Sequence, residues 1–151
     1  MTGSGLFRTK HGRELLRLGA VLFLLGLLVG LGIPHFPAPR QALSAHLLAV
    51  TQATLLMVLG VVWPRLQLTP RQSRLSSGLG IYGFPSAWLA TLLAALWKAG
   101  ATMMPMSSDG VYGTPAQELA IRLLLFSGAL CQIVFAVVVV WGLSGSTNAE
   151  A

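Results

Sequence analysis

The chain has 151 residues, of which 54% are hydrophobic and only 9% charged, and its mean hydropathy is +0.73. Soluble globular domains carry about 25% charged residues, and a chain this short cannot bury so much apolar surface in a water-soluble core. These values exclude an ordinary soluble domain and predict an integral membrane protein. The net charge of +6 does not indicate a nucleic-acid partner, because the basic residues form no stripe with interleaved aromatic residues.

Four apolar segments are long enough to cross a bilayer core of about 30 Å as helices. They cover residues 15–33, 44–63, 75–97 and 117–143. We therefore predict an all-α fold, a polytopic membrane protein built as a four-transmembrane-helix bundle. The remaining parts are a basic N-terminal segment at 1–14 and a C-terminal tail at 144–151.

The first segment follows a basic stretch and ends at Pro34. This arrangement is also typical of a signal peptide, but no small-residue cleavage site follows directly, so we interpret the segment as a retained span. Gly19, Gly26 and Gly30 lie on one face of this helix, which lets another helix backbone approach closely. Tight helix packing is the ordinary interpretation, and the alternative is that these glycines line a slot for a cofactor.

The second segment begins at Ser44, which we expect to cap the helix, and ends before Pro64. His46 lies about one turn into it and shares a helix face with Ala49 and Ala53. An imidazole in an apolar setting needs a hydrogen bond or a metal. Position alone leaves two interpretations open: a structural hydrogen-bonding histidine, or the ligand of a flat cofactor for which the small residues make room.

Polar residues inside the second and third segments form the next group of candidates. Gln52 lies one and two-thirds turns after His46, and such residues commonly form hydrogen bonds between helices. The alternative is that Gln52 orients a polar substrate near His46. The third segment carries Tyr82, Trp88 and Thr91, and its polarity indicates a helix that faces protein or a cavity. Two interpretations of Tyr82 remain open: it anchors the helix at the membrane interface, or it lines a pocket.

The connection at 98–116 leads into Glu118 and Arg122, on the side of the membrane that His46 also approaches. A glutamate four residues before an arginine is the favourable order for an ion pair on a helix. We therefore expect a structural Glu118–Arg122 pair. The alternative is that Arg122 holds a negatively charged group of a substrate or cofactor.

The Lys and Arg residues are distributed unevenly between the two sides of the predicted bundle. Seven of the ten lie on the side that holds both termini and the connection between the second and third segments. Positively charged loops stay on the cytoplasmic side of a membrane. We therefore predict that both termini are cytoplasmic.

Three stretches carry a resemblance to a known family, namely residues 43–66, 97–105 and 141–143. They resemble the hydroxylaminobenzene mutases, which are membrane-bound isomerases of bacterial nitroarene degradation. These enzymes convert an arylhydroxylamine into an ortho-aminophenol. The resemblance extends over residues 15–143, and it implies a small aromatic substrate and a location in the bacterial inner membrane.

The chain is more distantly similar to the styrene oxide isomerases, four-helix membrane proteins that assemble as trimers. These hold haem b between subunits through a His at the start of the second helix, a position that His46 matches. Gln52 falls on an Asn of that family, and Thr91 falls near its catalytic Tyr, so this phenol is absent here. The site that the resemblance implies comprises His46 as the iron ligand, Ala49, Ala53 and Arg122 at the haem, and Gln52, Thr91 and Tyr82 as catalytic residues.

The hypothesis that follows is an isomerase in which the haem iron acts as a Lewis acid on the N-hydroxyl oxygen. The oxygen moves to the ortho ring carbon without net redox change, while Gln52 orients the hydroxylamine. One alternative is a haem-dependent epoxide isomerase, against which the missing phenol argues. The other is a non-catalytic small membrane subunit.

Overall fold

The computed structural model describes residues 9–102 and 112–144, and all the regular secondary structure there is helical. The elements are α1 (Lys10–Gly32), η1 (Ile33–His35), α2 (Pro39–Val62), η2 (Trp63–Arg65), α3 (Pro70–Trp97) and α4 (Pro115–Ser144). Each α-helix is long and apolar enough to cross a membrane, so the all-α, multi-pass prediction is confirmed. Residues 1–8, 103–111 and 145–151 lie outside this description, and they include most of the expected N-terminal segment and C-terminal tail.

Three helices, α1, α2 and α3, begin five residues before the expected spans, because capping side chains or prolines set their starts; for α1 the cap is Thr9. The predicted cap at Ser44 is wrong: α2 begins at Pro39, and the Ser44 hydroxyl donates to the carbonyl of Arg40 inside the helix. Proline suits a first helical position, since its φ is already helical and it has no N–H to satisfy. Helix α3 begins at Pro70 after Thr69, whose side chain and backbone form a reciprocal capping box with Gln72.

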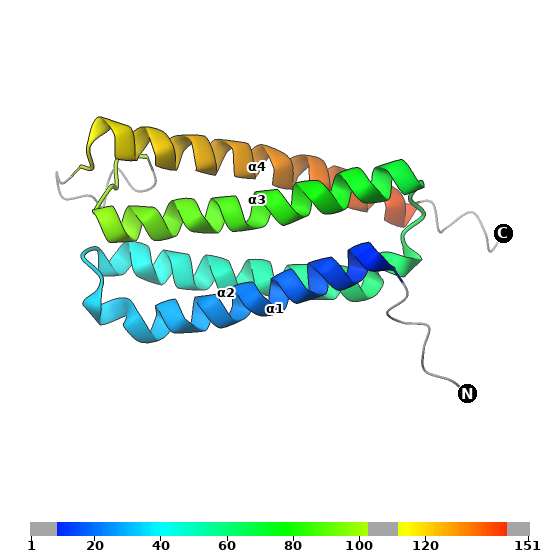
Figure 1. Cartoon of the computed structure of the whole chain (residues 1–151), viewed down its shortest axis with the longest axis horizontal. Coiled ribbons are helices and arrows are strands. Elements are labelled where there is room, and N and C mark those ends of the chain that lie inside the picture. Colours follow the sequence, from blue (N-terminus) through cyan, green and yellow to red (C-terminus); the bar gives the residue numbers. More distant parts are fainter. Residues whose placement is uncertain (1–8, 103–111, 145–151) are drawn as a thin grey trace.

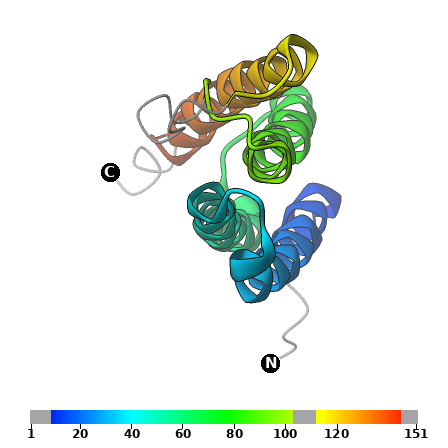
Figure 2. The same ribbon diagram turned by 90° about the vertical axis from the view of Figure 1, so that its left-hand side faces the viewer.

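The helices form two antiparallel hairpins, α1–α2 and α3–α4 (Figure 1). The start of α1, the end of α4 and η2 lie at one end of the bundle, while η1 and the start of α4 lie at the other (Figure 1). Helix α3 packs against both α1 and α2, whereas α4 packs chiefly against α3 (Figure 2). The bundle is therefore two hairpins joined through α3.

Small residues bring α1 and α2 close together. A Cβ atom added at Gly19 would lie 2.8 Å from the carbonyl oxygen of Ala53, and one added at Gly26 would lie 2.7 Å from the Cβ of Ala49. Both alanines are fully buried. The small-residue faces therefore serve tight helix packing, which is the ordinary interpretation of their spacing.

The α3–α4 hairpin has its own close crossing at Gly83 and Gly128. A Cβ added at Gly128 would lie 3.0 Å from the carbonyl oxygen of Gly83. The Gln132 side chain donates to that same carbonyl at 3.0 Å. Phe135 then links α4 to the rest, because it stacks on Trp63 and meets Phe84 edge to face. These contacts hold α4 in place although it packs on few other elements.

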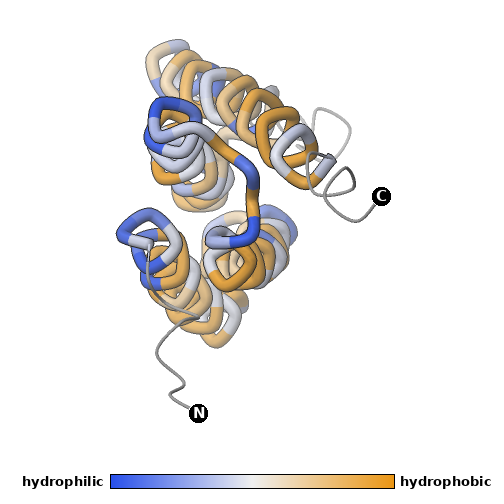
Figure 3. Tube along the Cα trace, turned by 90° about the vertical axis from the view of Figure 1, so that its right-hand side faces the viewer, coloured by the Kyte–Doolittle hydropathy of each residue, from blue (hydrophilic) through white to orange (hydrophobic). Residues whose placement is uncertain are grey.

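The outer surface of the helices is apolar. The exposed large side chains include Leu123, Phe126, Leu130, Val137 and Val140 on α4. Hydrophilic residues gather instead at the bundle end that carries η2 and the starts of α1 and α3 (Figure 3). This distribution is that of a protein with lipid as its solvent around the middle and water at its ends.

We predict that Gly60→Ala lowers the stability of the bundle. Its new Cβ would lie 2.7 Å from the carbonyl oxygen of Gly12, a backbone atom that cannot move aside alone. The expected loss is about 1–3 kcal/mol, measured by thermal unfolding in detergent. Gly78→Ala is the matched control, because nothing lies within 4 Å of its added Cβ. Equal behaviour of the two variants would contradict the packing described here.

Candidate functional site

His46 is held by a hydrogen bond to α1. Its Nδ1 lies 2.8 Å from the carbonyl oxygen of Gly26, twenty residues earlier in the chain. A carbonyl oxygen only accepts, so Nδ1 carries the proton and donates it. In the neutral imidazole, the lone pair then belongs to Nε2. The structural histidine and the ligand histidine are thus compatible: one nitrogen fixes the ring, and the other remains able to bind a metal.

Gly30 makes the space for this imidazole. A Cβ added there would lie 2.6 Å from Nδ1 of His46, 2.9 Å from Cε1 and 3.3 Å from Cγ. These are the ring atoms nearest to α1, so the Nε2–Cδ2 edge faces away from Gly30. The neighbouring side chains of Leu43 and Leu47 are exposed. The free nitrogen therefore belongs to the margin of the α1–α2 hairpin rather than to the centre of the bundle.

Among the residues that the structure describes, no cluster of metal ligands surrounds this nitrogen. Within residues 9–102 and 112–144, no three His, Cys, Asp or Glu side chains gather closely enough to hold a metal ion. His46 thus offers a single protein ligand. That number suits an iron whose other ligands come from a macrocycle, as in haem proteins with a proximal histidine.

The other residues expected near a cofactor on α2 lie in different surroundings. Ala49 and Ala53 are fully buried against α1, so neither presents surface for a flat cofactor beside this chain. Gln52 is also buried, but on the face toward α3, because it lies three turns before Trp63. Trp63 donates from Nε1 to the hydroxyl of Ser73 on α3 at 3.0 Å. His46 and Gln52 therefore lie on different faces of α2.

Both catalytic candidates on α3 have a partner for their hydroxyl group. Thr91 is buried and donates to the carbonyl of Ala87 in its own helix at 3.0 Å. Tyr82 is 48% exposed, and its hydroxyl lies 2.8 Å from that of Ser127 on α4. Tyr82 thus joins α3 to α4, on the side of α3 away from His46.

The expected ion pair between Glu118 and Arg122 is wrong. Glu118 instead accepts from the backbone N–H of Ala101 at 3.2 Å, the hydroxyl of Thr102 at 3.1 Å and the N–H of Gly113 at 3.3 Å. These donors come from both ends of the connection between α3 and α4. Arg122 is exposed, and the salt bridges among the described residues do not include it.

Two further features were not singled out from the sequence. Nδ1 of His11 lies 3.0 Å from the hydroxyl of Ser77 on α3 and 3.3 Å from a carboxylate oxygen of Glu14. The i, i+3 spacing of His11 and Glu14 is visible in the sequence, whereas the contact with Ser77 depends on tertiary packing. This polar contact fastens α1 to α3 at the end of the bundle away from His46.

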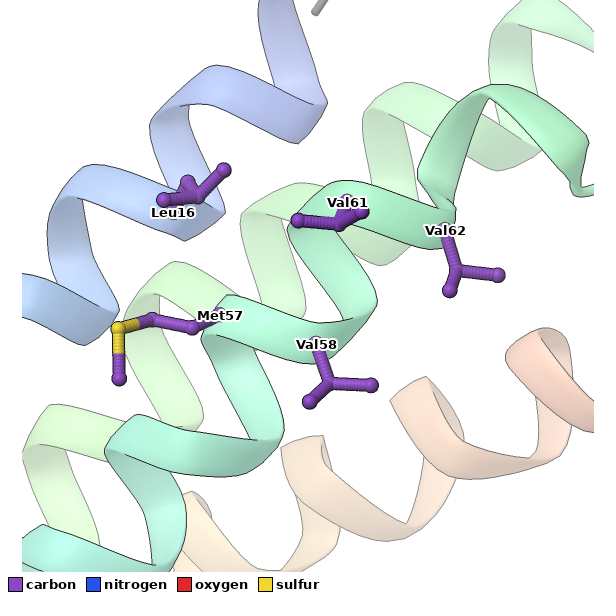
Figure 4. Close-up of a pocket in the computed structure, with 5 residues that line it drawn as sticks. All are labelled: Leu16, Met57, Val58, Val61 and Val62. Carbon is purple, nitrogen blue, oxygen red and sulfur yellow. The ribbon is translucent and has the colours of Figure 1, made fainter. Parts of the chain in front are cut away.

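The second feature is a shallow groove of about 310 Å³ (Figure 4). It is lined by Leu16 of α1 and by Met57, Val58, Val61 and Val62 of α2. The lining is wholly apolar, so this groove offers no group for acid–base or metal chemistry.

We predict that Glu118→Ala destabilises the protein by about 1–3 kcal/mol, because three donors lose their acceptor. Arg122→Gln is the matched variant and should leave the unfolding temperature unchanged. Thermal unfolding of both variants in detergent checks this. An equal loss of stability in the two variants would support the Glu118–Arg122 ion pair instead.

Comparison with known proteins places the chain among isomerases. The family model for styrene oxide isomerase matches residues 11–144. The chain is 44% identical over 131 residues to hydroxylaminobenzene mutase HabB of Ectopseudomonas oleovorans, covering 87% of this chain and 80% of that protein. It is 41% identical over 109 residues to hydroxylaminobenzene mutase HabA of the same organism, covering 72% of this chain and 81% of that protein. No solved structure matches.

These matches extend over almost the whole four-helix region and confirm the resemblance that residues 43–66, 97–105 and 141–143 carry. The relatives are named as mutases, which are enzymes of the isomerase class. The chain therefore belongs to the styrene oxide isomerase family and is a membrane-embedded isomerase.

Proposed function

We propose that the chain rearranges an arylhydroxylamine such as hydroxylaminobenzene into an ortho-aminophenol. The observation that carries this proposal is the 44% identity to a hydroxylaminobenzene mutase over 87% of the chain. In this reaction the N–O bond breaks and a C–O bond forms at the ortho carbon. The proton lost from that carbon is balanced by one gained at nitrogen, so atoms balance and no external oxidant or reductant is needed.

The surroundings of His46 support a bound haem b. Metal-binding histidines usually donate their second N–H to a carbonyl or carboxylate, as Nδ1 does here to Gly26. Gly30 leaves room for the ring, and Nε2 of His46 would hold the iron as a single protein ligand. When bound, the iron would supply a Lewis acid that polarises the N–O bond.

The chain itself would bind and orient the substrate. Gln52 has a buried amide that can hydrogen-bond the hydroxylamine group, and the hydroxyl oxygen of Thr91 keeps lone pairs that can accept. Leu22, Leu56 and Phe84 belong to the apolar core, whose side chains would hold an aromatic ring and exclude water.

We also propose a homotrimer with haem between subunits. The position of His46 at the margin of the α1–α2 hairpin supports this, since a group on its free nitrogen would extend beyond this chain. Arg122 lies among exposed apolar residues of α4, where a guanidinium needs a negative partner. A haem propionate would supply one.

The proposed location is the bacterial inner membrane with both termini in the cytoplasm. The end of the bundle at η2 and the starts of α1 and α3 carries six of the ten Lys and Arg residues, at positions 10, 13, 17, 65, 71 and 74. The positive-inside rule assigns that end to the cytoplasm.

The family model named for styrene oxide isomerase favours a second candidate, an epoxide isomerase. Two substrates separate the candidates. We expect purified protein to convert hydroxylaminobenzene into 2-aminophenol and to leave styrene oxide largely unchanged. Chromatography of the reaction mixtures measures both conversions. The opposite preference would establish the epoxide reaction, and no turnover of either would favour a non-catalytic subunit.

We predict that His46→Ala removes both the Soret band of the purified protein and its mutase activity. His35→Ala is the matched control, because His35 lies exposed in η1 and should retain both. A colourless wild-type protein, or a His46→Ala variant with full haem content, would contradict the ligand assignment.

Gly30→Ala tests the space around the imidazole. Its Cβ would overlap Nδ1 of His46, so the ring must turn and the bond to Gly26 must break. We expect haem affinity to fall roughly 10- to 100-fold, as for other losses of support around a metal ligand. Haem titration followed by absorbance measures this, with Gly78→Ala as the control that keeps wild-type affinity.

A further inference from the structure

The apolar groove on the α1–α2 hairpin lies close to the end of the bundle that carries η2. Figure 4 shows Leu16 of α1 beside the side chains of α2 that complete its lining, which are Met57, Val58, Val61 and Val62. Its volume of about 310 Å³ and its wholly apolar lining suit a hydrocarbon occupant, and in a membrane the nearest hydrocarbon is a lipid acyl chain. The charges around the groove then decide which lipid binds.

Two arginines of α1 lie on the same side of the helix as Leu16. The opposite side faces α3, because Nδ1 of His11 lies 3.0 Å from the hydroxyl of Ser77. Arg13, Leu16 and Arg17 follow His11 by two, five and six residues, which places all three about 120° or more from it around the helix. At spacings of three and four residues these side chains are neighbours, and both arginines are exposed.

A third arginine comes from the end of α2. Trp63 donates to Ser73 of α3, so the neighbouring Val62 points elsewhere, into the groove lining. Arg65 follows Val62 by three residues in the 3₁₀ turn η2, where side chains three residues apart lie above one another. Arg65 is exposed and therefore continues the row of Val62 toward the end of the bundle.

The arginines lie toward the water-facing end of the groove. A Cβ added at Gly60 would lie 3.2 Å from the Cβ of Leu16, so these two residues are at one level. Arg13 precedes Leu16 by three residues and Arg65 follows Gly60 by five, which places them about 4.5 Å and about 8 Å nearer the bundle end. Arg17 is close to the level of Leu16, and its long side chain can extend along apolar surface to the headgroups. Positive charge at the end and an apolar groove inward match the two parts of a phospholipid.

The acidic residues among 9–102 and 112–144 leave these charges unneutralised. Glu14 lies 3.8 Å from Lys10 and 3.3 Å from His11, on the other side of α1. Glu118 lies near the start of α4, at the opposite end of the bundle (Figure 1). The salt bridges of the described residues include none of the three arginines beside the groove.

We propose that the groove and Arg13, Arg17 and Arg65 form a binding site for an anionic phospholipid in the leaflet at this end of the bundle. The acyl chain lies in the groove, and the guanidinium groups donate charge-assisted hydrogen bonds to the phosphate. Basic pockets between membrane helices bind anionic headgroups in this way. Because α1 and α2 both supply cations, the lipid links the two helices at their η2 end.

This site is separate from the surroundings of His46. Val61 follows His46 by fifteen residues, which is about 22 Å along α2. The proposal therefore depends on neither the isomerase reaction nor the haem, and none of its tests measures turnover.

Lipid titration of the full-length protein in detergent tests the headgroup preference. The probes are dioleoylphosphatidylglycerol and dioleoylphosphatidylethanolamine, which have the same acyl chains, and native mass spectrometry counts the bound lipid. We expect phosphatidylglycerol to bind at least tenfold more tightly. Arg13→Gln, Arg17→Gln and Arg65→Gln should each lower that affinity roughly fivefold, as for the loss of one cation near an anionic surface. Arg13→Lys keeps the charge and should keep the preference.

Arg71→Gln is the matched control for these variants. It removes the same charge from the same end of the bundle, but Arg71 is an exposed residue of α3, on the other side of α1 from the groove. We expect it to keep the affinity of the wild type for phosphatidylglycerol. An equal loss in Arg71→Gln and Arg13→Gln would indicate a general attraction to a basic surface and overturn the proposal. Equal affinity of the wild type for the two lipids would overturn it as well.

Two other occupants of this surface give different results. Millimolar inorganic phosphate should not displace phosphatidylglycerol, and displacement would indicate a simple anion site that needs no lipid. Val61→Trp fills the groove, so we expect weaker binding of phosphatidylglycerol at an unchanged oligomeric mass. A changed oligomeric mass with unchanged lipid affinity would assign the groove to a second copy of the chain and overturn the proposal.

Discussion

The bond between Nδ1 of His46 and the carbonyl of Gly26 is the interaction on which the candidate functional site depends. It decides which nitrogen of the imidazole carries the proton and which edge of the ring faces outward. It also requires α1 and α2 to lie very close, because a backbone carbonyl cannot extend away from its helix as a long side chain can. The absence of side chains at Gly26 and Gly30, and the small alanines opposite, follow from this one requirement. The same residues of this hairpin therefore serve helix packing and the orientation of the imidazole.

Lipid as the solvent explains how polar groups are distributed through the rest of the bundle. Carbonyls, hydroxyls and amides along the helices are paired within the protein, as Gln132 with Gly83 and Tyr82 with Ser127. Glu118 satisfies three donors from the connection that precedes α4. Four buried side-chain atoms among the described residues have no such partner, on Gln41, Gln52, Ser76 and Trp88.

The apolar lengths of the sequence were sufficient to predict four helices, and the glycine spacing predicted their tight packing. The spacing of His46 and Gln52 was also sufficient to predict that they lie on different faces of the helix, because six residues turn a helix by about 240° beyond one full turn. Other features depend on residues that meet only after folding. The carboxylate of Glu118 accepts hydrogen bonds from three donors of the connection and does not pair with the arginine one turn away. Ser77 contacts His11, which is 66 positions distant in the sequence. Helix starts were misplaced because prolines outside the apolar segments, not the segments themselves, determine where α2 and α3 begin.

The hairpin arrangement has a consequence for how the protein is made. The hydrogen bond to Gly26 and the close contact with Gly30 that orient the imidazole lie within residues 26–46, in the first two helices to leave the ribosome. Contacts this close along the chain form early and do not wait for distant partners. The imidazole of His46 can thus be oriented while α3 and α4 are still being synthesised. The second hairpin packs onto the first afterwards, chiefly through α3, so the orientation of the His46 ring precedes completion of the bundle.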